Sequence, residues 1–264
     1  IVHHGKIIGE GYHRCYGEAH AEVNAIASVA NTDLFKDSTL YVNLEPCSHW
    51  GKTPPCAELI IRKGIPRVIV GMTDPFAEVC GNGIRKLRDA GIDVRVGILE
   101  KECEELNRKF VIYHTKRRPY IILKWAQTVD GYLDSNRSQD TPAAWMTGSV
   151  SKTLVHRLRS RSSAILTGTR TIMRDDPSLT VRHCSGKNPL RIVLDRTLSL
   201  NPASRVFDGE TETLVFTEAG KEYVARERYP RCEIAAVDFS TGIASALQAL
   251  YERKTADVLV EGGA

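Results

Sequence analysis

Residues 45–56 read EPCSHWGKTPPC, and together with the AHAE motif that contains His20 they determine what the first half of the chain can be. The two segments offer one imidazole, from His20, and two thiols, from Cys47 and Cys56. Three such ligands leave the fourth tetrahedral position of a zinc ion open, as in catalytic zinc sites. The sequence therefore predicts a catalytic zinc site. A closed structural site with His49 as the fourth ligand is the alternative.

The expected secondary structure places both thiols where a thiolate is stable. Cys47 directly follows a short apolar strand, and Cys56 falls in the first turn of a helix predicted over 55–63. Thr53 is the expected N-cap of this helix, and Pro54 is its expected first position. The dipole at a helix N-terminus favours negative charge, so it favours the thiolate form that binds metals.

Glu22 is the predicted proton carrier of this site. It lies two residues after His20 in the first turn of a predicted helix, so it points away from the direction of His20 but can still stand beside the metal. Zinc lowers the pKa of a bound water to about 7, and a neighbouring carboxylate can carry that proton to a ring nitrogen and a departing amine. This pattern predicts hydrolytic deamination. A zinc-binding module without activity is the alternative, but it has no use for this carboxylate.

Strands and helices alternate along the chain, which predicts an α/β fold with mostly parallel sheets. The elements predicted for the first half are a hairpin over 1–11, helices over 19–30, 55–63 and 83–90, and strands over 40–44, 66–71 and 94–96. The elements predicted for the second half are strands over 120–125, 163–167, 190–194, 213–216 and 257–260, and helices over 149–161 and 241–253. The basic stretch HTKRRP at 114–119 is the expected interdomain linker.

The composition is typical of a globular protein with two ordinary domains. The 264 residues carry a formal charge of +4, which suits anionic small substrates. Aromatic residues make up only 7% and the charges are interspersed, which argues against a nucleic-acid-editing deaminase. No apolar run is long enough to span a membrane. The seven scattered cysteines argue against a disulfide framework and for a reducing cytosol. Both ends of the sequence fall in strand-like stretches, so further residues are expected at each end.

The segment 45–56 resembles, along its whole length, the deaminase half of the bifunctional deaminase/reductase family of riboflavin biosynthesis. The common deaminase form, Pro-Cys-x-x-Cys, is shorter, because eight residues separate the two cysteines here. The resemblance continues through DP at 74–75, GNG at 81–83, LNRKF at 106–110 and RPY at 118–120. It implies a cytidine-deaminase-like three-layer domain over 1–116 with one zinc ion. A dihydrofolate-reductase-like α/β domain over 117–264, which uses NADPH, is implied to follow it.

The resemblance also implies the reaction and the first substrate pocket. The family deaminates a diaminopyrimidinone that carries a ribosylamino phosphate, and then reduces the ribosyl group to a ribityl group with NADPH. The residues implied to line the pyrimidine pocket are His49, Lys52, Thr53 and Asp74, although a solvated loop is the alternative for His49 and Lys52. Many members read Asp-Pro-Asn-Pro where this chain reads DPFA at 74–77, which leaves pocket roles in this stretch open.

The second half shows binding residues and not catalytic ones, which fits a hydride transfer, because that reaction needs no protein nucleophile and its chemistry belongs to the cofactor. The VEGG stretch at 260–263 is a strand opening into glycines, and such a turn can bind phosphate through main-chain amides. A plain turn is the alternative. The sequence lacks the Gly-x-Gly-x-x-Gly pattern of dinucleotide-binding Rossmann domains.

The resemblance implies two sets of contacts in this half. The residues implied to contact NADPH are Ala126, Trp145, Thr171, Asp175, Arg196, Gly262 and Gly263. The residues implied to contact the substrate are Lys124, Ala143, Arg159, Leu179, Arg182 and Glu261, with the arginines on its phosphate because a guanidinium binds phosphate oxygens in pairs. The alternatives are a core position for Trp145 and a solvated helix face for Arg159. The implied partner is a small phosphorylated pyrimidine, and a cytoplasmic homo-oligomer, a dimer or a tetramer, is expected.

Overall fold

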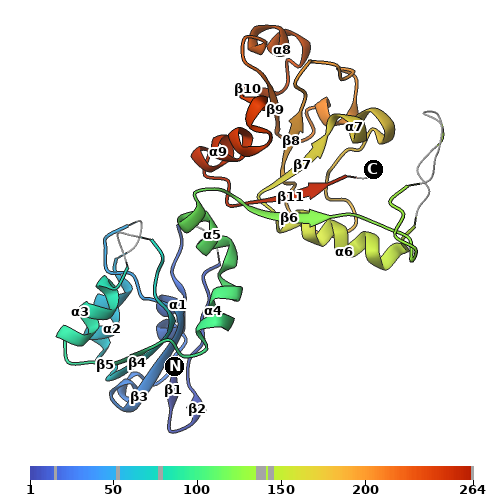
Figure 1. Cartoon of the computed structure of the whole chain (residues 1–264). Coiled ribbons are helices and arrows are strands. Elements are labelled where there is room, and N and C mark those ends of the chain that lie inside the picture. Colours follow the sequence, from blue (N-terminus) through green and yellow to red (C-terminus); the bar gives the residue numbers. More distant parts are fainter. Residues whose placement is uncertain (15–16, 52–53, 77–79, 135–140, 142–145, 263–264) are drawn as a thin grey trace. The chain divides into compact units, whose positions relative to one another are not determined.

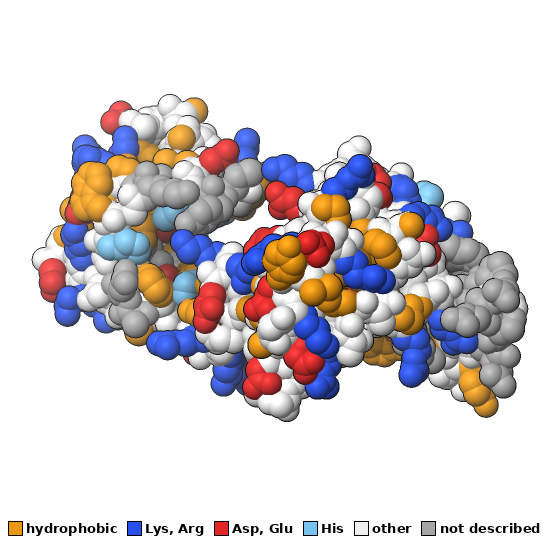
Figure 2. Space-filling view, turned by 90° about the horizontal axis from the view of Figure 1, so that it is seen from above, with side chains coloured by type: hydrophobic (Ala, Val, Ile, Leu, Met, Phe, Trp, Pro, Cys, Tyr) orange, Lys and Arg blue, Asp and Glu red, His pale blue; other side chains and the backbone are white. Residues whose placement is uncertain are grey.

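The computed structural model describes residues 1–14, 17–51, 54–76, 80–134, 141 and 146–262. The chain divides into two compact units, Ile1–Thr115 and Lys116–Ala264, called unit 1 and unit 2 below. None of the helices within the described residues is both long enough and apolar enough to cross a membrane. On the face shown in Figure 2, the described Lys and Arg side chains alternate with Asp and Glu side chains and form no continuous basic patch.

Unit 1 is built on a five-stranded sheet of order β2-β1-β3-β4-β5 (Figure 1). Its strands are β1 (Val2–His3), β2 (Lys6–Ile7), β3 (Ser38–Leu44), β4 (Arg67–Met72) and β5 (Asp93–Val96). The first two strands form the predicted hairpin and pair antiparallel, whereas β3, β4 and β5 run parallel. Its helices are α1 (Ala21–Ala27), the 3-10 helix η1 (Thr32–Asp37), α2 (Cys56–Lys63), α3 (Asn82–Asp89), α4 (Glu100–Leu106) and α5 (Arg108–Lys116).

Helices cover both faces of this sheet, which gives three layers. Side chains on alternate positions of β4, such as Val68 and Val70, are fully buried in one core with residues of α1, α2 and α3. The opposite face of β4 carries Gly71, where a Cβ atom would lie 2.2 Å from the Sγ atom of Cys103 on α4. Helix α4 therefore packs directly on the backbone of β4, and only glycine permits this approach.

Unit 2 contains a six-stranded, fully parallel sheet of order β10-β9-β8-β7-β11-β6. The strands are β6 (Tyr120–Lys124), β7 (Ala164–Gly168), β8 (Leu190–Leu194), β9 (Thr213–Glu218), β10 (Glu233–Val237) and β11 (Asp257–Glu261). The helices are α6 (Ser149–Ser160), α7 (Thr169–Asp175), α8 (Glu222–Arg228) and α9 (Ala244–Glu252), with short 3-10 helices η2 (Arg205–Phe207) and η3 (Phe239–Thr241).

Successive residues of these strands enter two different cores. Ile165 packs in the core that includes Ile172 of α7, whereas Leu166 packs in the core that includes Leu250 of α9. A parallel sheet that is covered on both faces needs such unbroken apolar runs, and its ligands commonly bind beyond the carboxyl ends of the strands. Because β11 lies between β7 and β6, the carboxyl ends of these three strands are adjacent in space.

Several elements differ from the sequence-based expectation. Helix α1 begins at Ala21 with His20 as its N-cap, two residues later than the predicted start at residue 19. The N-cap of α2 is Pro55, so the expectation of Thr53 is wrong, and Thr53 lies outside the described residues. Elements without a prediction include η1, α4, α5, α8 and β10. Helix α5 extends to Lys116, within the stretch expected to be a linker.

Candidate active sites

Three predicted metal ligands lie together in unit 1. The Nδ1 atom of His20 is 3.4 Å from the Sγ atom of Cys56 and 3.5 Å from that of Cys47. All three donor atoms lie within 4.8 Å of one another. Zinc bonds of about 2.0–2.3 Å at tetrahedral angles separate neighbouring nitrogen and sulfur donors by about 3.6–3.8 Å, so the donor set fits one zinc ion.

Local structure brings these ligands into place and prepares the thiols. Cys47 follows β3, and its sulfur accepts the main-chain N–H of Cys56, the first residue of α2, at 3.3 Å. A hydrogen bond from the Cys56 thiol lowers the pKa of Cys47 to about 4, and the same bond together with burial raises the pKa of Cys56. The pair therefore readily forms one thiolate, and a metal ion would displace the remaining thiol proton.

Glu22 lies beside these ligands and is not one of them. Its side chain projects from the first turn of α1, and the residue is only 8% exposed. Burial raises the pKa of its carboxyl group, and its closest titratable neighbours include Cys56 and His20. A raised carboxyl pKa makes the group a stronger proton acceptor, as a proton carrier requires.

Glu45 is a residue of this site that the sequence analysis missed. Its carboxylate is buried and accepts four main-chain N–H groups, two on each oxygen. The donors and their distances are Asp74 at 3.2 Å, Gly81 at 2.9 Å, Gly83 at 2.8 Å and Ile84 at 3.1 Å. Glu45 thus joins the end of β3, two residues before Cys47, to the loop that carries Asp74 and to the N-terminus of α3. The sequence signal that could have pointed to Glu45 is an acidic residue directly after an apolar strand.

Gly83 makes this junction possible. A Cβ atom at Gly83 would lie 1.9 Å from the carbonyl oxygen of Pro46 and 3.2 Å from Oε1 of Glu45. Only glycine lets the start of α3 approach the segment before Cys47 so closely.

The predicted pyrimidine-pocket residues are placed only in part. Asp74 is buried, which raises the pKa of its carboxyl group, and it accepts the main-chain N–H of Phe76 at 2.8 Å. The ring of His49 lies 6.5 Å from that of Phe76, which in turn lies 4.9 Å from the ring of His114. Phe76 therefore adds an aromatic surface beside His49, in the stretch 74–77 whose pocket roles the sequence leaves open. Lys52 and Thr53 lie outside the described residues.

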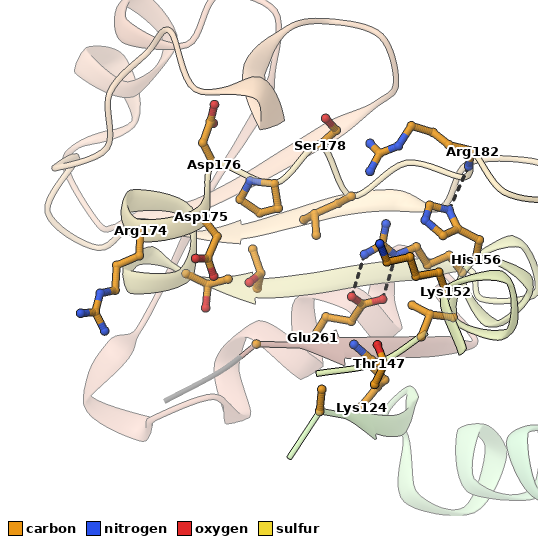
Figure 3. A pocket seen from close by; sticks show the side chains of 18 of the residues that line it. Lys124, Thr147, Lys152, His156, Arg174, Asp175, Asp176, Ser178, Arg182 and Glu261 are labelled. Carbon is orange, nitrogen blue, oxygen red and sulfur yellow. Dashed lines mark hydrogen bonds and ion pairs between the residues drawn. The ribbon is translucent and has the colours of Figure 1, made fainter. Parts of the chain in front are cut away.

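Unit 2 contains a cavity of about 560 Å³ beyond the carboxyl ends of β6, β11 and β7 (Figure 3). Nine of the residues expected to bind NADPH or substrate line it: Lys124, Ala126, Arg159, Thr171, Asp175, Leu179, Arg182, Glu261 and Gly262. Ala143, Trp145 and Gly263 lie outside the described residues. Arg196 is not among the lining residues. It pairs with Glu218 at an exposed site.

Arg159 and Glu261 form a buried ion pair in the wall of this cavity. The Nε and Nη2 atoms of Arg159 each donate to one carboxylate oxygen of Glu261 at 2.8 Å, and Nη1 donates to the carbonyl oxygen of Thr180 at 3.0 Å. Dashed lines at Glu261 in Figure 3 mark the first two of these bonds. The side chains are 11% and 9% exposed, so the alternative of a solvated helix face for Arg159 is wrong. In this arrangement Arg159 orients the Glu261 carboxylate and the neighbouring loop. Contact of Arg159 with the phosphate of the substrate remains a prediction.

Comparisons with known proteins agree for both units. The family described as the cytidine and deoxycytidylate deaminase zinc-binding region matches residues 1–72, and the RibD C-terminal domain matches residues 119–264. The riboflavin biosynthesis protein RibD of Aquifex aeolicus is 41% identical over 265 residues, which cover all of this chain and 73% of the relative.

The chain belongs to the RibD family.

The RibD protein of a Synechocystis species is 39% identical and matches over all of this chain and 71% of its own length. Among solved structures, the chain is similar to a diaminohydroxyphosphoribosylaminopyrimidine deaminase/5-amino-6-(5-phosphoribosylamino)uracil reductase from Thermotoga maritima. The TM-score is 0.86 at 42% identity, over 99% of this chain and 72% of that one. A RibD structure from Acinetobacter baumannii has a TM-score of 0.82 at 33% identity, over 98% of this chain and 72% of that one. The predicted family and the predicted succession of two α/β domains are confirmed.

His156 is a second residue that the sequence analysis of this RibD-family chain missed. It is 6% exposed, and its Nδ1 atom accepts the main-chain N–H of Arg182 at 2.9 Å (Figure 3). Burial, with the positive charges of Arg159, His183 and Arg182, lowers the pKa of His156 to about 4. The imidazole is therefore neutral at physiological pH and remains an acceptor. It holds Arg182 at the edge of the cavity.

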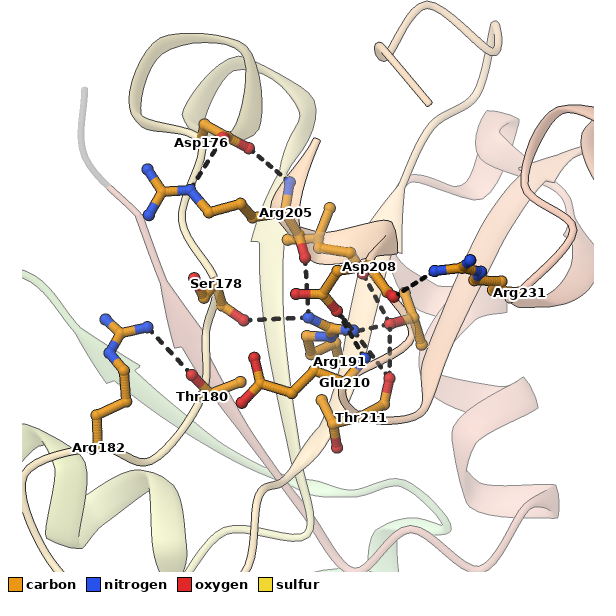
Figure 4. Close-up of polar contacts among 12 residues, drawn as sticks. Asp176, Ser178, Thr180, Arg182, Arg191, Arg205, Asp208, Glu210, Thr211 and Arg231 are labelled. Carbon is orange, nitrogen blue, oxygen red and sulfur yellow. Dashed lines mark hydrogen bonds and ion pairs between the residues drawn. The ribbon is translucent and has the colours of Figure 1, made fainter. Parts of the chain in front are cut away.

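Arg191 stabilises the loop that contains Ser178 and Arg182. Its guanidinium is fully buried on β8 and donates to the Thr213 hydroxyl, to Asp208 and to three main-chain carbonyls (Figure 4). These carbonyls belong to Ser178, Arg205 and Thr211. Since Ser178 lines the cavity, Arg191 fixes part of the cavity wall without lining it. A buried arginine with all donors paired is a structural element whose removal leaves several acceptors unsatisfied.

Proposed function

We propose that the chain is a bifunctional enzyme of riboflavin biosynthesis. It would first deaminate the diaminopyrimidinone that carries a ribosylamino phosphate, and then reduce its ribosyl group to a ribityl group with NADPH. The observation that carries this proposal is the convergence of His20, Cys47 and Cys56 beside the buried Glu22, in a chain of the RibD family.

In the deamination, His20, Cys47 and Cys56 would hold zinc, which supplies an activated water when bound. Glu22 receives a proton, passes it to a ring nitrogen of the pyrimidinone, and later supplies a proton to the departing amino group. A carbon–oxygen bond forms, the carbon–nitrogen bond breaks, and ammonia leaves. Burial of Glu22 suits this task, because a raised carboxyl pKa approaches the working pH of the reaction.

In the reduction, NADPH supplies a hydride when bound, and the residues of unit 2 orient the two reactants. Thr171, Asp175, Ala126 and Gly262 would contact the cofactor. A Cβ atom at Gly262 would lie 3.5 Å from the hydroxyl oxygen of Thr171, so these two residues expected to bind the cofactor are close in space. Lys124, Leu179, Arg182 and Glu261 would contact the substrate, and Arg182 would bind its phosphate.

The direct test is to incubate the purified chain with the diaminopyrimidinone phosphate and to follow ammonia release and NADPH oxidation separately. Glu22→Gln is expected to retain zinc and to lose deamination by about 10³-fold or more, because general acid–base catalysis contributes about 10²–10⁴-fold. Reduction of the deaminated substrate should continue at the wild-type rate. Ammonia release at the wild-type rate by Glu22→Gln contradicts the proton-carrier role.

We also propose that the protein is a cytoplasmic homo-oligomer, a dimer or a tetramer. Its small phosphorylated substrate supports the location, because such metabolites are held inside cells. Light scattering of the purified protein tests the oligomeric state. A mass equal to that of a single chain contradicts it.

A further inference from the structure

Thr167 is a buried polar residue at the cavity of unit 2 that no expectation assigns to either ligand. It lies near the carboxyl end of β7, one residue before Gly168, the N-cap of α7. The residue is 0% exposed, yet it lines the cavity. Its hydroxyl oxygen has no hydrogen-bond partner within the described part of the chain. Native proteins rarely leave a buried hydroxyl unsatisfied, and such a group calls for a specific explanation.

The sheet register explains why the side chain of Thr167 lies on the face of the sheet that borders the cavity. Glu261 of β11 pairs with Lys124 of β6, and Val260 of β11 pairs with Leu166 of β7, so the next residue of β7, Thr167, lies beside Glu261. Paired residues of adjacent parallel strands point to the same face of a sheet. Lys124, Glu261 and Thr167 therefore form one row across three strands, and all three line the cavity. Figure 3 shows Lys124 and Glu261 of this row.

Glu261, the neighbour of Thr167 in this row, already has a partner of its own. Arg159 binds both carboxylate oxygens of Glu261, which leaves this carboxylate fixed in direction. The hydroxyl of Thr167 is uncharged and can both donate and accept a hydrogen bond, so it can bond an amide or a hydroxyl group of a ligand. Thr167 lies beside Glu261, which is expected to bind the substrate, and four residues before Thr171 of α7, which is expected to bind the cofactor. The reactive ends of the two ligands must meet at such a place.

We propose that Thr167 is a ligand-binding residue whose hydroxyl bonds a neutral polar group at the reacting end of the bound ligands. This group is an amide or a hydroxyl, and it comes either from the nicotinamide of NADPH or from the sugar of the substrate. The inference rests on the proposed reductase function.

The test compares Thr167→Val, which removes the hydroxyl and keeps the shape, with Thr167→Ser, which keeps the hydroxyl. In Thr167→Val, the dissociation constant for NADPH alone or the KM for the pyrimidine phosphate is expected to rise about tenfold, the loss typical of one hydrogen bond in a buried site. A change in NADPH binding, followed by its fluorescence, assigns the group to the nicotinamide. A change in KM alone assigns it to the sugar. Thr167→Ser should restore most of the affinity.

The thermal midpoint of the ligand-free protein gives an independent readout. Because the hydroxyl has no partner in the protein, Thr167→Val should unfold at the wild-type temperature or above it. A fall of several degrees, or unfolding of the variant at room temperature, contradicts the inference, since the hydroxyl then has a partner inside the protein. Wild-type values for both ligands in Thr167→Val also contradict it.

Deaminase activity of the same chain serves as the internal control for each variant. If the wild-type chain neither binds NADPH nor reduces the substrate, the proposed reductase function fails. If the wild-type chain does both and Thr167→Val is indistinguishable from it, only the inference on Thr167 fails.

Discussion

Replacing Glu45 by glutamine should destabilise unit 1 strongly while leaving unit 2 intact. The carboxylate accepts two main-chain N–H groups on each oxygen, at 2.8–3.2 Å. An amide has one oxygen, so whichever way it turns, its NH₂ group faces two of the four donors. Two hydrogen bonds to a charged acceptor are lost, each worth about 1.5–3 kcal/mol. Relaxation of the loop recovers part of this, and we expect a net loss of about 3 kcal/mol.

Differential scanning calorimetry of the full chain measures this effect, because two compact units can unfold in separate transitions. A loss of about 3 kcal/mol should lower the midpoint of the unit 1 transition by roughly 10 °C or more. Glu58→Gln is the matched control. Glu58 pairs with Lys86 in a half-exposed ion pair, and such pairs contribute about 0–1 kcal/mol. Equal midpoints for Glu45→Gln, Glu58→Gln and the wild type would refute the assigned role of Glu45.

Three further predictions concern both sites. The pKa of His156 is about 4 in the folded protein and near 6.5 in the unfolded chain. As the pH falls, the unfolded chain therefore binds this proton first. Unit 2 then loses stability from pH 6.5 towards pH 4. In His156→Gln, the free energy of unfolding, measured in urea at pH 7 and pH 4.5, should fall less between these two pH values than in the wild type. An equal fall in the variant and the wild type speaks against a lowered pKa of His156. Gly83→Ala places a Cβ atom 1.9 Å from the Pro46 carbonyl oxygen, so we expect at least tenfold slower deamination with normal reduction; wild-type ammonia release would show that the junction tolerates a methyl group. Arg182→Ala should raise the KM for the phosphorylated substrate about tenfold without weakening NADPH binding, and an unchanged KM in the reductase assay rejects its phosphate contact.

The zinc ligands could be predicted from the sequence because their chemistry and their local structure agree. A histidine at a helix start, a cysteine after a strand and a cysteine at the next helix start are each common, but the parallel strands bring all three to one edge of the sheet. The distances of 3.4–3.5 Å from His20 to the two sulfurs follow from that arrangement.

The role of Glu45 could not be predicted, because its four donors lie 29 to 39 residues further along the chain. Its position becomes meaningful only when the end of β3 meets the start of α3. Thr167 illustrates the same limit. Within its own strand it is one residue of an apolar run, and its place beside Glu261 depends on β11 entering the sheet between β7 and β6.

Helices α4 and α5 escaped prediction for a different reason. Residues 100–116 are mostly charged or polar, and neither helix contains a fully buried residue, so the apolar periodicity that reveals a helix is weak. The Arg159 side chain shows a further difficulty. Its flanking arginines suggested a solvated surface, whereas the ion pair with Glu261 on a distant strand buries it.

The central claim is that His20, Cys47 and Cys56 hold one zinc ion with an open fourth position. X-ray absorption spectroscopy at the zinc edge, combined with metal analysis of the purified protein, tests it most directly. We expect one zinc per chain, with two sulfur neighbours at about 2.3 Å and two nitrogen or oxygen neighbours at about 2.0–2.1 Å, one of them exchangeable with added ligands. A chain that binds no zinc, or a zinc ion with more than two sulfur neighbours, contradicts the claim.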